Sequence, residues 1–288
     1  MSASAAALVP AAPPAPPELP EGVDPFPRWP LWYGPFGIAC GFATGIVGAF
    51  MLALPMLGIA SVTEASFEDT IPALGQLATV VQDVGLVAVA LLLADRTAPP
   101  RAWHFGLRRP RAWPAVGWAV LALAAFWVFV LPLELLPEGP SEEISPKVGL
   151  VLLVIVGAVL IVVAPVTEEF FFRGFLYRSL RSRMAVLPAA AVDGMVFGLL
   201  HAPNGLIAVP LISILGFIMC LLYERTGSLY PCIAVHAAHN TLVALLGSDA
   251  AAGPVFATIG ALTVAACVAA AARTRSSDPL AVRAEAAA

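Results

Sequence analysis

The sequence predicts an all-α, polytopic integral membrane protein of about eight transmembrane helices that enclose an intramembrane polar cavity. The 288 residues are 60% hydrophobic and 12% charged, and the mean hydropathy of +0.89 is far above that of soluble domains. Apolar runs near the twenty residues needed to cross a bilayer recur along the chain. A few ionisable residues fall inside these runs, where each is costly unless it faces a polar cavity or a partner.

The apolar runs define the expected spans in chain order. They are Leu31–Val62, Ile71–Ala94, Trp113–Leu136, Val148–Ala164 continuing into a charged stretch, Val186–Leu200, Leu206–Tyr223, Leu229–Leu246 and Val255–Ala272. The first run is long enough to contain a kink at Pro55. We therefore expect a transmembrane domain over residues 31–272, with a disordered Ala/Pro-rich tail at 1–30 and a short disordered tail at 273–288.

The fourth run raises a problem of length. A single helix from Val148 to Arg183 would be about 54 Å long, whereas the hydrocarbon core is about 30 Å thick. We expect this helix to tilt, to protrude or to break at Pro165. A break would expose helix N-terminal amides beside Glu168, with Thr167 as a capping side chain.

The orientation follows from basic residues, which gather in alternate loops. These are Arg96, Arg101, Arg108, Arg109 and Arg111, then Arg178, Arg181 and Arg183, then Arg225, and finally Arg273 and Arg275. The intervening loops carry Glu64, Glu68 and Asp69, then Glu138, Glu142 and Glu143 with Lys147, and then Asp249. The positive-inside rule predicts that both termini are cytosolic. The net charge of −4 offers no basic surface for nucleic acid, and membrane lipids are the expected surroundings.

Eight ionisable residues lie within the spans and form the list of candidates. They are Asp83, Glu168, Glu169, Arg173, Asp193, His201, His236 and His239. In a helix, Glu169 and Arg173 are at i and i+4, the order that favours an ion pair. Glu168 projects about 100° away and stays available. A carboxylate in such a site can take a proton from water and later return it.

Two further patterns place polar side chains one helical turn apart. FGLLH puts Phe197 beneath His201, and HAAHN puts His236 and Asn240 on one face. Hydrogen-bond donors on one face are what an oxyanion developing on a peptide carbonyl needs. Counting helical rise from the expected cytosolic helix ends lets Glu168, His201, His236 and Asn240 line one cavity entered from the cytosol.

The remaining polar residues in the spans have less specific interpretations. His239 adds a third imidazole on a neighbouring face, and Asp193 either tunes His201 or faces a polar interior. We expect Asp83 to seal an interhelical contact. The four cysteines, Cys40, Cys220, Cys232 and Cys267, lack CxxC spacing and are expected to be small buried hydrophobes.

The motifs EEFFFR (Glu168–Arg173), FGLLH (Phe197–His201) and HAAHN (His236–Asn240) resemble the three ordered motifs of the CPBP family. That family contains the type II CAAX prenyl endopeptidases and the bacterial Abi proteins. Its pattern is EExxxR, FxxxH and HxxxN or HxxxB on an eight-helix membrane bundle. The likeness is strong over 165–240, within a core of about 148–246, and the segment His104–Trp113 also resembles the loop that precedes the family's core.

The resemblance implies a membrane-embedded endopeptidase in a bacterial plasma membrane, acting on a peptide or a lipidated, CAAX-type protein. Glu168 would activate the attacking water with help from His201, and Glu169 and Arg173 would position the helix and the substrate. His236 and Asn240 would stabilise the oxyanion. The family is also described as metalloproteases, so the alternative to a metal-free site is zinc held by Glu168, His201 and His236.

Two other classes of function remain open from the sequence. A transporter also keeps carboxylates and histidines in its spans as a proton relay, but the chain shows no inverted repeat. A non-catalytic scaffold or bacteriocin-immunity protein would retain the bundle and lose the site. The effect of Glu168→Gln on activity discriminates between these classes and a protease.

Overall fold

The computed structural model describes residues 29–63, 67–134, 150–248 and 250–274. The tails expected at 1–30 and 273–288 therefore fall almost wholly outside the described residues, as do Glu138, Glu142, Glu143, Lys147 and Asp249. The described chain is helical throughout and contains no strand, which confirms the all-α prediction.

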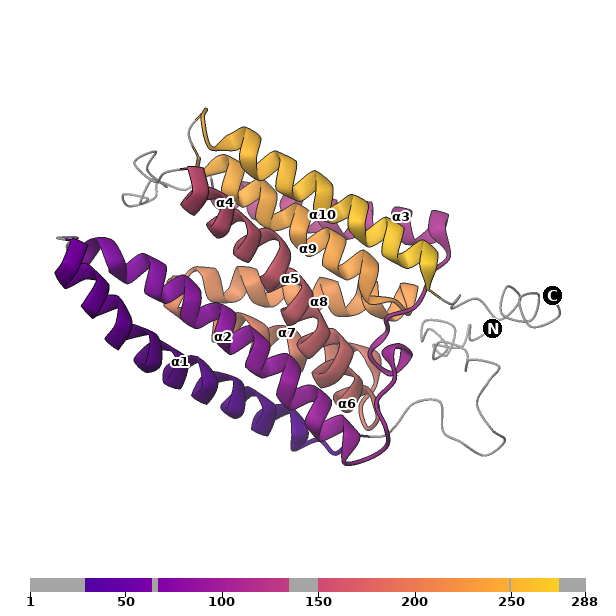
Figure 1. Ribbon diagram of the computed structural model, residues 1–288. Helices are drawn as coiled ribbons and strands as arrows, with labels where there is room; N and C mark the ends of the chain where they lie inside the picture. Colours follow the sequence, from indigo (N-terminus) through magenta and orange to yellow (C-terminus); the bar gives the residue numbers. More distant parts are fainter. Residues whose placement is uncertain (1–28, 64–66, 135–149, 249, 275–288) are drawn as a thin grey trace, which may run out of the picture.

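The helices form one bundle (Figure 1). The long ones are α1 (Tyr33–Thr63), α2 (Phe67–Asp95), α3 (Ala112–Glu134), α8 (Ala208–Thr226), α9 (Leu229–Leu246) and α10 (Gly253–Arg273). Among the described residues, seven helical stretches are long and apolar enough to cross a membrane, and α7 (Val186–Leu200) is a shorter apolar helix. The chain is thus a multi-pass integral membrane protein, and the expected eight spans become seven full spans and one short helix.

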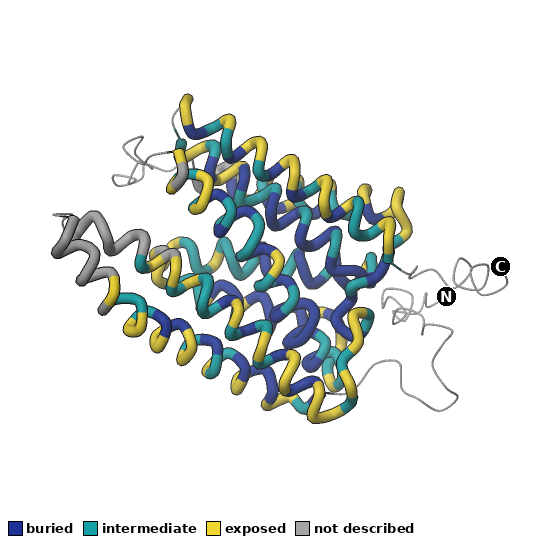
Figure 2. The backbone as a smooth tube through the Cα atoms, viewed as in Figure 1, coloured by how far each residue is buried: buried dark blue, intermediate teal, exposed yellow. Residues whose placement is uncertain are grey.

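The outer surface of the bundle is apolar, as a bilayer requires. Large hydrophobic side chains are exposed around it, including Phe50, Val128 and Val268 with exposed fractions of 68%, 71% and 64%. Figure 2 shows the exposed residues on the outward sides of the helices and the buried residues between them. Lipid replaces water around these side chains, so their exposure carries no hydrophobic cost.

Close helix pairs give the bundle its rigidity. Gly41, Gly45 and Gly48 of α1 lie against the α2 side chains Leu86, Gln82 and Val81, with no room for a Cβ at any of the three glycines. The α1 helix is continuous through Pro55. Small residues let helix backbones approach closely in a membrane. This contact fixes the face of α2 that bears Gln82 and Asp83.

Glycines also allow close packing in the α7–α8 pair. Gly194 and Gly198 of α7 lie against the backbone of α8 around Ser213 and Phe217. In Figure 1 the α1–α2 and α9–α10 pairs lie on either side of the helix that carries the EEFFFR motif, and the α7–α8 pair passes behind it. The three polar motifs are therefore held on separate helices that meet in the interior.

The helix with the EEFFFR motif runs unbroken from Leu150 to Arg181. Its parts are α4 (Leu150–Ala158), the π-helix η3 (Val159–Val163), α5 (Ala164–Glu169), the π-helix η4 (Phe170–Tyr177) and α6 (Arg178–Arg181). Right-handed helical dihedrals continue across the junctions. The possible break at Pro165 is absent, and Thr167 does not cap a helix: its hydroxyl donates back to the carbonyls of Val163 and Ala164.

The π-helix explains why Pro165 does not break this helix. The Ala164 N–H donates to the Val159 carbonyl, five residues back. The same spacing would direct the N–H of residue 165 to the Leu160 carbonyl, but proline has no N–H. The side-chain amide of Asn240 donates to that carbonyl at 2.8 Å instead. Helix α9 thereby supplies the hydrogen bond that the proline cannot.

A short loop sets the start of α9. The 3-10 helix η2 (Ala102–Phe105) ends at Gly106, whose φ of +90° suits glycine. The Gly106 carbonyl accepts from the Leu229 N–H, and the Arg108 carbonyl accepts from the Ser228 hydroxyl, which also caps α9. This loop lies in the segment His104–Trp113 and fixes the helix that carries HAAHN.

His104 is the titratable residue at the centre of this loop. Its Nδ1 accepts the Arg101 N–H at 3.1 Å, so that nitrogen carries no proton. Burial, and then the charges of Arg178, Arg101 and Arg108, lower the pKa of His104 to about 4. The loop that fixes α9 therefore contains a neutral histidine at pH 7.

Candidate active site

A fully buried ion network surrounds Glu169. The Arg173 guanidinium donates to Glu169 Oε1 at 2.9 Å and to the Gly216 carbonyl at 3.0 Å. Its Nε lies 3.7 Å from Asp193 Oδ1, which also accepts from the Cys220 thiol at 3.1 Å. The predicted i, i+4 pair of Glu169 and Arg173 is confirmed, and both side chains are 0% exposed.

Aromatic rings enclose the guanidinium on its remaining sides. The Arg173 Cζ lies 4.6 Å from the centroid of the Phe197 ring and 5.9 Å from that of Phe172. A cation over a ring face is stabilised by the ring quadrupole, most strongly where water is excluded. Phe197 thus contacts both the ion network and His201, whose ring centroid is 4.6 Å away.

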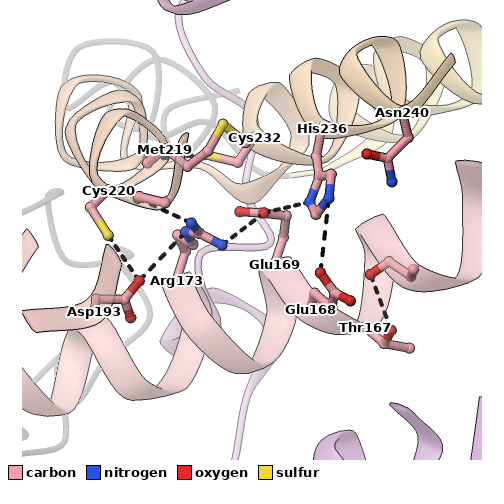
Figure 3. A network of polar contacts seen from close by, with 12 residues as sticks. Thr167, Glu168, Glu169, Arg173, Asp193, Met219, Cys220, Cys232, His236 and Asn240 are labelled. Carbon is pink, nitrogen blue, oxygen red and sulfur yellow. Dashed lines mark hydrogen bonds and ion pairs between the residues drawn. The ribbon is translucent and has the colours of Figure 1, made fainter. Parts of the chain in front are cut away.

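His236 joins this network to the second carboxylate (Figure 3). Its Nδ1 lies 2.8 Å from Glu169 Oε1, and its Nε2 lies 3.9 Å from Glu168 Oε2. Because Glu169 is ionised by its pairing with Arg173, its oxygen can only accept, so the proton of neutral His236 is on Nδ1. The Nε2 of neutral His236 is then a bare acceptor that faces Glu168.

His201, at the C-terminal end of α7, also directs its Nε2 toward Glu168. Its Nδ1 lies 2.8 Å from the Phe197 carbonyl, which can only accept, so Nδ1 carries the proton. Its Nε2 lies 4.0 Å from Glu168 Oε2. Glu168, His201 and His236 therefore direct three acceptors toward one region. At separations of 3.9 to 4.0 Å, Glu168 Oε2 makes no direct hydrogen bond to either histidine nitrogen, and polar contacts longer than 3.5 Å are ones that water can bridge.

The three groups line a cavity of about 430 Å³ inside the bundle. Its wall is built from α1, α2, the α4–η4 helix, α7, η5 (Ala202–Asn204), α8 and α9. Asn240 lines it as well, so all four residues expected in one cavity are there. The side chain of Glu168 is 15% exposed, that of His201 24% and that of His236 5%. The expected intramembrane polar cavity is present.

Asp83 lines the cavity in addition to lying between helices. It was expected to seal a contact between helices, and it is only 1% exposed, yet it lines the cavity together with Gln82 and Thr79. Its Oδ2 is buried without a hydrogen-bond partner. Because Asp83 and Thr79 are at i and i+4 on α2, a polar strip faces Glu168 from that helix.

The structure adds detail to the predictions for four other polar residues. Asp193 does not contact His201 in the described network but pairs with Arg173 and Cys220. His239 lines the cavity with its ring 4.9 Å from Phe126 and 5.6 Å from Trp127, centroid to centroid. Neutral His236 has no proton to donate to an oxyanion from Nε2, because Glu169 fixes its proton on the other nitrogen. One hydrogen of the Asn240 amide is already used by Leu160.

The cysteines lie as expected. All four are free; Cys220, Cys232 and Cys267 are buried, and Cys40 is half-buried. Within the described residues, no group of three or more His, Cys, Asp and Glu side chains is arranged to hold a metal ion.

Comparisons with known proteins agree with the motifs. Residues 150–242 match the family model described as Type II CAAX prenyl endopeptidase Rce1-like, and this range contains the EEFFFR, FGLLH and HAAHN motifs. The chain is also 24% identical over 172 residues to "Putative membrane peptidase YdiL" of Bacillus subtilis (strain 168). That match covers 55% of this chain and 66% of the relative, just under two thirds of its length. No solved structure matches the chain.

Proposed function

We propose that the chain, whose residues 150–242 match the Rce1-like type II CAAX prenyl endopeptidase model, is a member of the CPBP family and acts as an intramembrane endopeptidase. Its reaction is hydrolysis of a peptide bond in a membrane-associated or lipidated polypeptide by water that Glu168 activates. Its location is a bacterial plasma membrane with both termini in the cytosol, supported by the basic loops at one end of the bundle.

The observation that carries the proposal is the convergence of three hydrogen-bond acceptors on one region of a buried cavity. Glu168 Oε2, His201 Nε2 and His236 Nε2 all face it, and the two histidine orientations are fixed by bonds at Nδ1. A water molecule placed there donates its protons to two of these acceptors and presents an oxygen lone pair to a substrate. This is the geometry of a general-base hydrolase.

In the proposed reaction, Glu168 takes one proton from the water as its oxygen attacks the carbonyl carbon. The carbonyl π bond opens and its electrons become the oxyanion of a tetrahedral intermediate. Glu168 then returns the proton to the leaving nitrogen as the carbon–nitrogen bond breaks. The products are a carboxylic acid and an amine, so atoms and charge balance without a covalent enzyme intermediate.

His236 has a second role once it is protonated. The imidazolium carries a proton on Nε2 and can donate to the oxyanion, while Glu169 at 2.8 Å stabilises the positive charge. The added positive charge lies beside Glu169, the acceptor that also holds Arg173. Asn240 contributes the hydrogen of its amide that Leu160 does not use.

The spacing of these residues does not match zinc ligands as it stands. Tetrahedral zinc with bonds of about 2.0–2.1 Å sets its ligand atoms roughly 3.3 Å apart. Glu168 Oε2 lies 3.9 and 4.0 Å from the two histidine nitrogens, so both separations would have to close by about 0.6 Å. The Nδ1 bonds of the histidines do resemble the outer hydrogen bonds of metal ligands. We propose the metal-free reaction.

The proposed function is tested by replacing Glu168 with glutamine. Glu168→Gln keeps the volume and removes the base, so we expect substrate cleavage to fall at least ~10²-fold at unchanged expression. Comparative proteomics of membrane fractions from cells with either form would identify uncleaved substrates that accumulate with the variant. Full activity in the glutamine variant would contradict the glutamate mechanism.

Metal content separates the two versions of the site. Purified protein is expected to contain well under one zinc per chain and to keep its activity in EDTA. Loss of activity in EDTA, with recovery on added zinc, would instead assign Glu168, His201 and His236 as zinc ligands.

A further inference from the structure

Asp83 is a buried acid in the cavity wall to which the proposed reaction gives no role. It lines the cavity from α2 and is 1% exposed. Its Oδ2 has no hydrogen-bond partner, and none of the ion pairs described between side chains includes Asp83. A buried polar atom without a partner costs free energy, and an ionisable group inside a membrane span is for that reason a candidate functional group.

The contact between α1 and α2 fixes the direction in which Asp83 points. A Cβ at Gly85 would lie 2.0 Å from Thr44 Oγ1, and a Cβ at Gly45 would lie 2.9 Å from the Gln82 Cβ. The face of α2 that bears Gln82 and Gly85 therefore packs directly on α1. Residues 83 and 85 of a helix point about 160° apart, so Asp83 points away from this contact.

Asp83 and Glu168 reach the cavity from neighbouring helices at a similar depth. Helix α2 packs along α5 and its flanking π-helices, and the two helices run toward the same end of the bundle (Figure 1). At ~1.5 Å per residue, Asp83 lies about 18 Å before the end of α2 and Glu168 roughly 20 Å before the end of α6. The two carboxyl groups also interact electrostatically. Asp83 therefore borders the region that Glu168 faces.

The hydroxyl groups near Asp83 do not supply the missing donor. Thr167 lies next to the carboxyl group, but its hydroxyl donates to the Val163 carbonyl at 2.8 Å. Thr79, one turn before Asp83 on α2, donates to the Gly75 carbonyl at 3.0 Å. Each hydroxyl has a single proton, so both are already committed to backbone carbonyls. The Asp83 Oδ2 is left available to a group from outside this chain.

The polar groups that Asp83 shares the cavity with are mainly acceptors. Glu168 Oε2 and the Nε2 atoms of His201 and His236 face one region, and Asp83 adds a further acceptor beside them. A carboxyl group accepts hydrogen bonds in either protonation state. A polypeptide brings the complementary groups, because each residue except proline carries an N–H that needs a partner once it leaves water.

We propose that Asp83 is a substrate-binding residue, whose Oδ2 accepts a hydrogen bond from an N–H group of the polypeptide in the cavity. That this polypeptide is then cleaved rests on the proposed function, whereas the binding rests on the position of Asp83. The bond holds the polypeptide against α2 while its carbonyl faces the water beside Glu168. Burial of the N–H and burial of Oδ2 then satisfy each other.

The N–H group can come from two parts of a polypeptide. A backbone amide needs only an acceptor oxygen, which an asparagine at position 83 retains. A lysine or arginine side chain needs the negative charge as well, which asparagine lacks. The variants Asp83→Asn and Asp83→Ala therefore separate these two sources, and Asp95→Asn is the matched control. Asp95 is an exposed acid at the end of the same helix.

Thermal midpoints in detergent separate binding from helix packing. Asp83→Asn keeps the volume of the side chain, and among the described residues Oδ2 has no partner to lose. We expect its midpoint to equal or exceed that of the parent, as for a group retained for function at the expense of stability. Asp95→Asn should leave the midpoint unchanged. A lower midpoint for Asp83→Asn would assign Asp83 to an interhelical contact and overturn the proposal.

Peptide affinity tests the binding itself without depending on cleavage. The probes are short fluorescein-labelled peptides of leucine and alanine, one without lysine and the others with a single lysine at successive positions. Their dissociation constants are measured by fluorescence anisotropy with full-length Glu168→Gln protein, alone and combined with each substitution at Asp83 or Asp95. We expect Asp83→Ala to weaken binding at least ~10-fold and Asp95→Asn to leave it unchanged.

The Asp83→Asn variant then identifies the source of the N–H. Affinity within about 3-fold of the Glu168→Gln protein, without preference for any lysine position, would assign a backbone amide. A preferred lysine position that both Asp83→Asn and Asp83→Ala abolish would assign a cationic side chain. Unchanged affinity in Asp83→Ala, or no binding of any peptide, would overturn the proposal. Binding that depends on Asp83, with no cleavage of the same peptide by the parent, would instead contradict the proposed function alone.

Discussion

Glu168 and Glu169 lie on the same turn of α5 in opposite environments. Glu169 is 0% exposed, bonded to Arg173 and His236, and does not itself line the cavity. Glu168 is 15% exposed, lines the cavity and faces two histidine nitrogens at 3.9 and 4.0 Å. Neighbouring residues of a helix point about 100° apart. Glu169 therefore points into the buried ion network, and Glu168 points into the cavity.

The comparison shows how a buried network supports a reactive group. Glu169 fixes the tautomer of His236, and His236 in turn presents a bare nitrogen to Glu168. Arg173 holds Glu169 and is held by the Gly216 carbonyl and by Asp193. We therefore expect changes in the dry network to affect folding first, and changes in the cavity to affect turnover first.

The largest expected effect is on stability, from Arg173→Ala. The substitution leaves Glu169 and Asp193 buried without their cation, a change of roughly 3–5 kcal/mol in buried pairs. We expect a clear fall in the thermal midpoint in detergent. Exchange of the pair, Glu169→Arg with Arg173→Glu, should not restore it, because a glutamate at 173 would face the acceptors of Gly216 and Asp193. A normal midpoint for Arg173→Ala would mean that the network does not stabilise the fold.

The next effect is on turnover, from His236→Ala compared with His239→Ala. Both residues line the cavity from α9, but of the two it is His236 that forms a described ion pair with Glu168, at 3.9 Å. We expect kcat to fall ~10²–10³-fold for His236→Ala with little change in KM, since the interaction strengthens in the transition state. Equal losses in the two variants would show that the cavity, and not the His236 contact, determines the rate.

We expect a smaller effect from Asn240→Ala. It should appear both in stability and in turnover. The change removes the donor to the Leu160 carbonyl, and a buried carbonyl without a partner costs about 1–3 kcal/mol. Both the thermal midpoint and kcat should therefore fall. Asn240→Asp should be at least as damaging, because its carboxylate would face a carbonyl oxygen. An unchanged midpoint with reduced kcat would assign Asn240 to catalysis alone.

Much of the fold could be predicted from hydropathy, because each span must be apolar over a fixed length. The Glu169–Arg173 pair followed from helical spacing within one segment. The partners of Arg173 on other helices could not be predicted, since Gly216 contributes only a backbone carbonyl and Asp193 only a single buried carboxylate. The periodicity of one helix does not indicate which face of another helix it packs against.

The helix around Pro165 shows a second limit. A proline and excess length indicated a break, but the π-helix Val159–Val163 moves the orphaned carbonyl to Leu160, where Asn240 reaches it. The sequence contains both residues involved, Pro165 and Asn240, but they lie on different spans. Only the packing of α9 on this helix reveals the pairing. Asp83 was likewise visible as an intramembrane acid, but its position at the cavity depends on the α1–α2 contact.

The most direct test of this division compares Glu168→Gln with Glu169→Gln in one experiment that records the thermal midpoint and the cleavage rate of each purified variant. We predict that Glu168→Gln keeps the parent midpoint and loses at least ~10²-fold in rate. We predict that Glu169→Gln lowers the midpoint, because Arg173 loses its ionised partner. The reverse pattern, with an active Glu168→Gln variant or a Glu169→Gln variant of unchanged stability, would contradict the assignment of the two carboxylates.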